Sequence, residues 1–187
     1  MLKDVVGLKD RGYNFSEVAY VLDLPKGEGL KCDKAVGLDM IFGMICDCIR
    51  ENDEAGIIGL YGTRGVGKTT ILRKINNEFQ HNDFDVVVWV TVSKAVNEER
   101  IHKEVGDVMG LTQKENANQV ARAADIHKIF IGKKFLLLFN DIWKKVELVR
   151  IGILDPIGST DRSSKVIFTT RSERVCRLMK AKKKIQS

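Results

Sequence analysis

The sequence predicts a three-layer α/β/α fold, in which helices cover both faces of a mostly parallel sheet. Four short apolar or β-branched runs alternate with segments whose apolar residues recur at helical spacing. Such an alternation is typical of βαβ units, which place their strands in parallel. The chain has 187 residues and 44% hydrophobic content, which is enough to bury the core of one such domain.

The periodicity places each element along the chain. Strands are expected at 57–61, 84–92, 134–139 and 165–170. Apolar residues at helical spacing predict helices at 38–50, 70–79, 101–109 and 120–130. The apolar run of the third strand reaches Phe139, and the strand is expected to end in Asn140-Asp141.

The first 29 residues are predicted to be a separate unit. Residues 1–25 have a helical pattern, and Pro25-Lys26-Gly27-Glu28-Gly29 form the clearest linker in the sequence. A helical segment this short cannot bury a core alone, so we expect 1–29 to be the end of an upstream domain. Residues 30–187 then form the second domain.

The net charge of +6 is concentrated in one part of the sequence. Residues 162–187 carry nine Lys or Arg against Glu173 alone, a charge of +8, which leaves −2 for residues 1–161. Lys180 to Lys184 could contact nucleic acid or acidic lipid. We favour a solvated charged end, and nucleic acid is not an expected partner.

The four cysteines, Cys32, Cys46, Cys48 and Cys176, do not make a disulfide framework. Cys46 and Cys48 lie two apart on an expected helix, so they point to different faces and lack the spacing of a zinc site. We expect buried, reduced thiols. The apolar runs are too short to span a membrane, and the N-terminus lacks a signal-peptide core. The sequence therefore predicts a cytoplasmic protein, with a peripheral position at the plasma membrane as the alternative.

Gly62 to Thr69 fit the phosphate-binding pattern G-x-x-x-x-G-K-[ST], between an expected strand and an expected helix. Glycines let successive backbone N–H groups point at phosphate oxygens, and the helix N-terminus adds its dipole. Lys68 is expected to reach the outer phosphates, and the Thr69 hydroxyl to ligate Mg²⁺. The pattern thus predicts a P-loop NTPase fold; the alternative is a Gly-rich turn that binds nothing.

Two further polar sites are expected at the carboxyl ends of neighbouring strands, where a phosphate loop needs its partners. Asn140-Asp141 stand at the Walker-B position, where Asp141 supplies the only carboxylate to hold Mg²⁺ through water or orient an attacking water. Arg171 follows the strand 165–170 and can reach a terminal phosphate. The alternatives are a structural Asn-Asp turn and a surface arginine at a helix start.

Four segments together resemble the nucleotide-binding (NB-ARC) region of plant intracellular immune receptors of the coiled-coil, leucine-rich-repeat class. They are GLYGTRGVGKTT (59–70), FDVVVWVTVSK (84–94), KKFLLLFNDIW (133–143) and SKVIFTTRSERV (164–175). Their order and spacing extend the resemblance over nearly everything from residue 36 onward. Residues 5–25 also look like the end of the family's coiled-coil domain, and Trp143 is the mark of its non-TIR branch.

The resemblance implies a molecular switch for defence against pathogens, ADP-bound and closed at rest, ATP-bound and oligomeric when an effector is sensed. It implies ADP or ATP with Mg²⁺ as cofactor, and other receptor domains or immune-signalling proteins as partners. The implied nucleotide-binding residues are Val36, Gly62, Gly65, Val66, Gly67, Lys68, Thr69, Thr70 and Arg171. Thr69 and Asp141 are the implied metal-holding residues, and Asp141 and Lys68 the residues that any catalysis would use.

Some positions depart from the family pattern. Val36 could line the adenine pocket through its backbone, but Leu38 stands where the wider family often has an arginine and cannot replace its hydrogen bonds. The third strand usually ends Leu-Asp-Asp in the family, whereas Asn140 replaces the first carboxylate here. This loss should weaken Mg²⁺ binding and slow hydrolysis, so we predict nucleotide binding with little turnover. Arg64 replaces a common glycine and could contact phosphate or solvent.

The family's Gly-Leu-Pro-Leu segment, helical and winged-helix subdomains and leucine-rich repeats do not follow in this sequence. Residues 30–187 are therefore expected to be a truncated nucleotide-binding subdomain. The leading function is a nucleotide-binding switch module. The second is an enzyme proper, a P-loop ATPase or kinase, against which Asn140 argues. The third is a non-hydrolysing relic or adaptor that acts through protein contacts.

Overall fold

The computed structural model describes residues 38–50, 56–80, 83–92, 97–111, 117–153 and 164–187. Its helices are α2 (Asp39–Arg50), α3 (Lys68–Phe79), α4 (Glu98–Val108), α5 (Gln119–Phe130) and α6 (Glu173–Leu178), with a 3₁₀ turn η2 (Leu148–Ile151). The strands are β1 (Ile57–Tyr61), β2 (Val86–Thr91), β3 (Phe135–Ile142), β4 (Lys165–Thr170) and β5 (Lys183–Gln186). The predicted unit 1–29 and Val36 lie outside the described residues.

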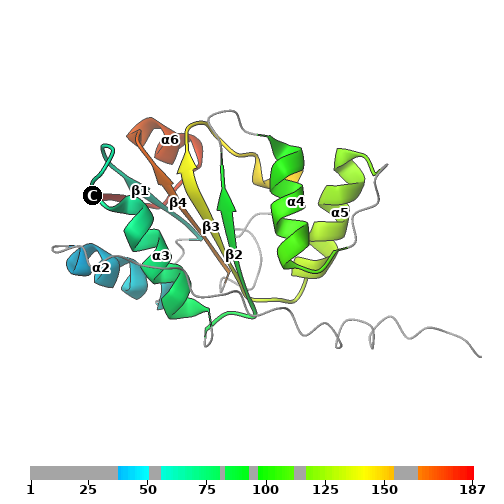
Figure 1. Ribbon diagram of the computed structural model, residues 1–187, viewed down its shortest axis with the longest axis horizontal. Coiled ribbons are helices and arrows are strands. Elements are labelled where there is room, and N and C mark those ends of the chain that lie inside the picture. Colours follow the sequence, from blue (N-terminus) through cyan, green and yellow to red (C-terminus); the bar gives the residue numbers. More distant parts are fainter. Residues whose placement is uncertain (1–37, 51–55, 81–82, 93–96, 112–116, 154–163) are drawn as a thin grey trace, which may run out of the picture.

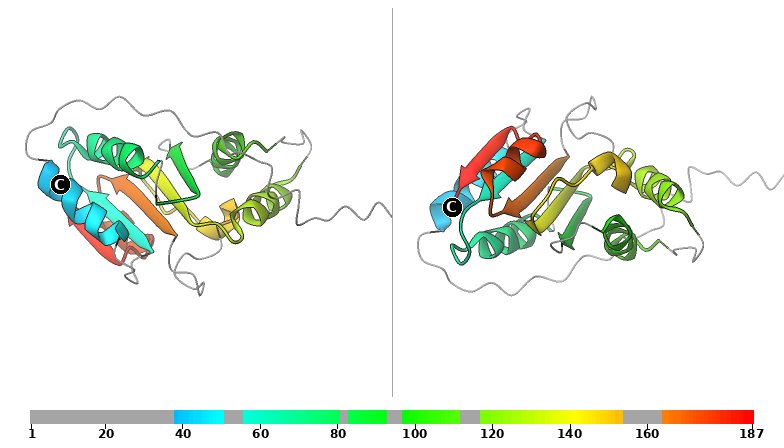
Figure 2. Two further views of the ribbon diagram at one scale, coloured as in Figure 1. Left: turned by 90° about the horizontal axis from the view of Figure 1, so that it is seen from below. Right: turned by 90° about the horizontal axis from the view of Figure 1, so that it is seen from above.

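The strands form one sheet in the order β2-β3-β4-β1-β5, and every neighbouring pair is parallel. Figure 1 shows the strands fanned between the helices, and Figure 2 shows α3 and α6 on opposite sides of the sheet. This confirms the predicted three-layer α/β/α fold with a parallel sheet. No helix of the described part of the chain is long and apolar enough to cross a membrane.

The core is split by the sheet into two apolar clusters, because successive side chains of a strand point to opposite faces. In β3, Phe135, Leu137 and Phe139 belong to the cluster shared with α4, α5 and α6. Leu136 and Leu138 belong to the cluster shared with α2 and α3. The helix predicted at 70–79 is confirmed as α3, and its four apolar residues are fully buried: Ile71, Leu72, Ile75 and Phe79.

The lysines from Lys180 to Lys184 are exposed, as predicted, but the sequence did not reveal that 183–186 form the edge strand β5. It pairs in parallel with β1, and Ile185 is buried against the α2–α3 side of the sheet. Lys183 and Lys184 are exposed. Lysines are common on edge strands, where their charge discourages pairing with another chain. The run of lysines therefore made β5, in which only Ile185 is buried, hard to recognise from the sequence.

The free thiols of Cys46 and Cys176 are buried, as predicted, whereas Cys48 is half-buried and Cys32 lies outside the described residues. Burial raises the pKa of both buried thiols from 9.0 to about 11. An unfolded chain would ionise these thiols at lower pH than the folded chain. The free energy of unfolding should therefore fall as the pH rises through this range.

Gly152 and Gly132 offer a matched test of backbone packing. Both have a left-handed φ, 86° and 71°, but only at Gly152 would an added Cβ meet backbone, the carbonyl oxygen of Ala123 at 2.3 Å. We expect Gly132→Ala to lower the free energy of unfolding by about 1 kcal/mol through the φ alone. Gly152→Ala should cost about 3 kcal/mol, because α5 must also shift. Urea denaturation measures the free energy of unfolding of both variants. Equal losses would contradict the close contact between Gly152 and the backbone of Ala123.

Candidate functional site

The loop Gly62–Gly67 connects β1 to α3 at the carboxyl end of the sheet. Gly65 and Gly67 have φ angles of 86° and 89°, a conformation that glycine adopts without steric cost. No side chain caps the start of α3 at Gly67. The first N–H groups of α3 can therefore donate to an anion, which the helix dipole also favours.

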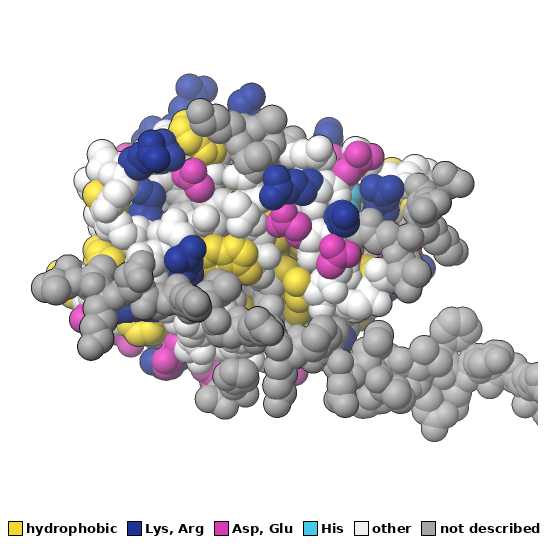
Figure 3. Space-filling view, viewed as in Figure 1, with side chains coloured by type: hydrophobic (Ala, Val, Ile, Leu, Met, Phe, Trp, Pro, Cys, Tyr) yellow, Lys and Arg dark blue, Asp and Glu magenta, His cyan; other side chains and the backbone are white. Residues whose placement is uncertain are grey.

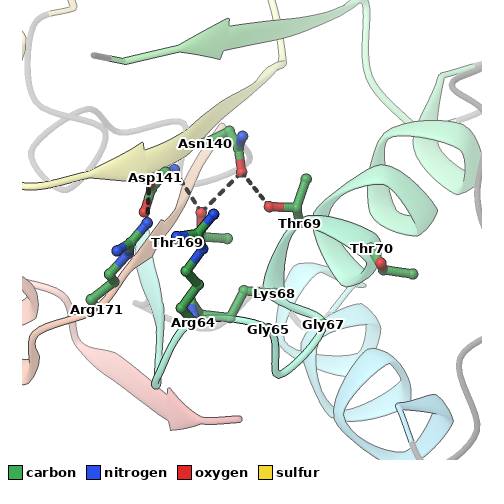
Figure 4. Close-up of a pocket in the computed structure, with 10 residues that line it drawn as sticks. All are labelled: Arg64, Gly65, Gly67, Lys68, Thr69, Thr70, Asn140, Asp141, Thr169 and Arg171. Carbon is green, nitrogen blue, oxygen red and sulfur yellow. Dashed lines mark hydrogen bonds and ion pairs between the residues drawn. The ribbon is translucent and has the colours of Figure 1, made fainter. Parts of the chain in front are cut away.

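A cavity of about 350 Å³ lies beside this loop. Figure 4 shows its lining residues: Arg64, Gly65, Gly67, Lys68, Thr69, Thr70, Asn140, Asp141, Thr169 and Arg171. The structure thus brings most of the predicted site residues together. Gly62 and Val66 belong to the loop but do not line the cavity, and Val36 lies outside the described residues. The side chain of Thr70 points away from Asn140 and Asp141 (Figure 4).

Lys68 is the first residue of α3 and is largely buried. Its Nζ donates to the carbonyl oxygens of Gly62, at 2.7 Å, and Thr63. Burial lowers the pKa of Lys68 below its ordinary value; the nearby Asp141 carboxylate opposes this shift and the Arg171 guanidinium adds to it. The ammonium is therefore held over the loop and in the field of both side chains.

Asn140, on β3, connects the first turn of α3 to β4. Its Oδ1 accepts hydrogen bonds from the hydroxyls of Thr69, at 3.0 Å, and Thr169, at 3.2 Å (Figure 4). Two hydroxyl donors on one oxygen do not require a charged acceptor, so the amide satisfies both. The hydroxyl of Thr69, predicted to ligate Mg²⁺, is therefore placed by Asn140.

The third strand carries Asn140 and Asp141 at its end, as predicted, and extends to Ile142 across a bulge-like irregularity in its pairing with β4. The register with β4 shifts between Phe139 and Ile142, and Asp141 has a φ of 56°. The N–H of Asp141 donates to the Thr169 hydroxyl at 2.8 Å. In a regular strand, Asn140 and Asp141 would point to opposite faces. The bulge lets both line the cavity, at the cost of a backbone conformation that Asp tolerates better than most residues.

Asp141, Trp143 and Arg171 form a connected cluster at one side of the cavity. Asp141 Oδ2 accepts from Arg171 Nη2 at 3.4 Å and from Trp143 Nε1 at 3.2 Å. The Arg171 guanidinium also lies over the Trp143 ring, 4.3 Å from its centroid. Each member therefore contacts the other two.

Residues 39–187 match the NB-ARC domain. The chain belongs to the NB-ARC domain family. The resemblance drawn from the four sequence segments is thereby confirmed, and with it a nucleotide-binding domain of the kind found in plant disease resistance proteins.

Curated relatives of this NB-ARC domain come from Arabidopsis thaliana. Disease resistance protein RFL1 is 42% identical over 94% of this chain and 20% of its own length. Disease resistance protein RPS5 is 40% identical over 94% of this chain and 20% of its own length. A putative disease resistance protein of the same plant is 38% identical over 99% of this chain and 51% of its own length. The chain thus spans between about a fifth and a half of these relatives.

A solved structure supports the fold independently of close sequence similarity. Cdc6p from Pyrobaculum aerophilum matches with a TM-score of 0.61 over 86% of this chain and 48% of that chain, at 13% identity. Such a likeness shows the fold alone. The NB-ARC domain thus has a P-loop NTPase fold, as the sequence predicted.

The chemistry of the cavity fits a nucleoside phosphate with a divalent cation. Arg64, Lys68 and Arg171 face a single carboxylate, Asp141, among the residues that line it. In Figure 3, Lys and Arg side chains lie over the region where α6 lies in Figure 1, with Asp and Glu side chains beside them. The Thr69 hydroxyl and Asp141 carboxylate are oxygen donors of the kind that Mg²⁺ binds together with phosphates and waters.

Sequence reasoning missed Thr169 as a site residue, although it named the segment around it. Its hydroxyl contacts both Asn140 and the backbone of Asp141, and only 1% of the residue is exposed. A buried threonine at the end of a central strand was the available signal, since a buried hydroxyl needs partners. Arg64, left open between phosphate and solvent, lines the cavity.

Proposed function

We propose that this NB-ARC domain is the adenine-nucleotide switch module of a plant intracellular immune receptor, binding ADP or ATP with Mg²⁺ and hydrolysing ATP slowly at most. The observation that supports this most is the cationic cavity at the phosphate loop, whose lining includes one carboxylate and an amide, Asn140, at the Walker-B position. Family membership supports the receptor context, and adenine specificity rests on the resemblance alone.

Each lining residue has a role in this proposal. The N–H groups of the loop and of the first turn of α3 donate to phosphate oxygens, and Lys68 neutralises the outer phosphates. Thr69 and Asp141 would hold Mg²⁺. When bound, Mg²⁺ supplies charge neutralisation for the phosphates. Arg171 senses the terminal phosphate.

Asn140 favours holding nucleotide over hydrolysing it. Its amide oxygen orients the Thr69 hydroxyl as a carboxylate would, but adds no charge toward the metal. Transition-state charge in phosphoryl transfer is stabilised mainly by the metal and the cations around it. With Asn140 in place of a carboxylate, the site would hold the metal more weakly and turnover would be slower, while the loop would still bind phosphate.

The rest of the proposal concerns the whole receptor. Residues 30–187 would be its nucleotide-binding subdomain, and 1–29 the end of a coiled-coil segment with its linker. Partners would be other receptor domains or immune-signalling proteins, with oligomerisation in the ATP-bound state. We expect a cytoplasmic location or a peripheral one at the plasma membrane.

Titration of the chain with fluorescently labelled ADP and ATP in the presence of Mg²⁺, with phosphate release followed in parallel, tests the proposal. We expect saturable binding of both nucleotides and less than one turnover per chain over the time of the titration. Repeated turnover would favour the enzyme proper. The absence of binding would contradict the switch and favour a relic or adaptor that acts through protein contacts.

A further inference from the structure

We propose that Trp143 is a positioning residue that stores Arg171 on Asp141 and thereby sets the relative affinity of the site for nucleoside di- and triphosphates. This inference rests on the proposed switch function. It assigns to Trp143 a physical role in ligand discrimination, beyond its use as a mark of one branch of the family.

Trp143 contacts both charged members of the cluster in different ways. Its indole N–H donates to Asp141 Oδ2 at 3.2 Å, which holds the carboxylate in place. The face of its ring lies under the Arg171 guanidinium at 4.3 Å, within the range of a cation–π contact. Trp143 therefore orients the Asp141 carboxylate and stacks on the Arg171 guanidinium. These two groups form an ion pair with each other at 3.4 Å.

The stored position of Arg171 competes with phosphate binding. A guanidinium that stacks on Trp143 and pairs with Asp141 must turn to donate to a terminal phosphate, since these contacts fix its plane and one of its edges. The Asp141 carboxylate, in turn, is available to a metal ion with its full charge only when its ion pair with Arg171 is broken. Only a triphosphate has the terminal phosphate to which Arg171 can donate after leaving Asp141 and Trp143. The arrangement with Arg171 on Asp141 and Trp143 therefore favours binding of the diphosphate.

The strength of the cluster suits a switch. The Arg171 and Asp141 side chains are 37% and 35% exposed, so water weakens their ion pair. The ion pair and the cation–π contact are each worth roughly a two- to fivefold shift in an equilibrium. A charge-assisted bond to phosphate can overcome such a bias, yet the bias is large enough to change which nucleotide is held.

The first test uses Trp143 as its own probe. The sequence has two tryptophans, and the other, Trp89, donates to Thr91 Oγ1 on the edge strand β2. In a Trp89→Phe background the emission of Trp143 should change when Mg·ATP binds and stay close to the nucleotide-free value with Mg·ADP. Adding Arg171→Gln should change the emission without any nucleotide. Equal responses to ADP and ATP would overturn the proposal.

The second test separates the two contacts of Trp143. Trp143→Leu removes the aromatic face and the N–H, whereas Trp143→Phe removes the N–H and keeps a smaller aromatic face. We expect Trp143→Leu to raise the affinity for ATP relative to ADP by about fivefold. Trp143→Phe should stay within about twofold of the original ratio, and thermal melting checks that both variants fold.

The outcomes distinguish this inference from the proposed function. Retained binding of both nucleotides with an unchanged ratio in Trp143→Leu would overturn the role of Trp143 and leave the switch intact. If Trp143→Leu does not fold, an emission of Trp143 that does not change when ATP binds still overturns it. Failure of the unmodified chain to bind either nucleotide would contradict both proposals.

Discussion

Replacing Lys68 with alanine is expected to weaken the binding of Mg·ADP and Mg·ATP by roughly 30- to 1000-fold. The substitution removes a largely buried ammonium that points into the loop, and charge-assisted hydrogen bonds to phosphate contribute about 2–4 kcal/mol together. Equilibrium titration with labelled nucleotide measures the loss.

Two further variants make this result specific. Lys103→Ala removes the same charge from an exposed position of α4 and should leave the affinity within about twofold. Lys68→Met keeps a side chain of similar length without the charge. If both variants lose the same nucleotide affinity, the loss comes from the charge of Lys68 and not from its packing. An affinity that survives both Lys68 variants would mean that the cavity is not the nucleotide site.

Replacing Asn140 with aspartate is expected to raise Mg²⁺-dependent ATP turnover by about tenfold or more. The carboxylate can accept from Thr69 and Thr169 as the amide does, so the hydrogen bonds are retained. The added charge strengthens metal binding, and a gain of about 1.4 kcal/mol in transition-state stabilisation is a tenfold rate increase. Phosphate release under saturating Mg·ATP measures the effect.

Asn140→Ala is the matched control for this gain. It removes the acceptor from both hydroxyls without adding a charge, so turnover should stay at or below the original rate. Equal rates for the original chain and Asn140→Asp would contradict the account, because the amide would then not be what limits hydrolysis.

The central strands were predictable because their sequences satisfy several requirements at once. β3 and β4 have apolar, β-branched or aromatic runs that are buried on both faces, the pattern of strands inside a parallel sheet. β5 could not be recognised in the same way. It is an edge strand with one buried residue, Ile185, and its exposed lysines resemble a solvated tail. Pairing with β1, a long-range contact, decides its structure.

The phosphate loop was predictable from local sequence, whereas the contacts across the site were not. Glycines with left-handed φ and a lysine at the helix start are local requirements, and the motif states them directly. The bulge at Asp141 depends on how β3 pairs with β4, which is not visible in the sequence of β3. The storage of Arg171 on Trp143 likewise joins two strand ends that are far apart in the chain.

Calorimetric titration of the chain with ADP in the presence of Mg²⁺ tests the central claim most directly, because it needs neither a label nor turnover. We predict a saturable heat with a stoichiometry near one nucleotide per chain, and a heat of the same stoichiometry with ATP. A folded chain that gives no saturable heat with either nucleotide would contradict the assignment of this NB-ARC domain as a nucleotide-binding switch.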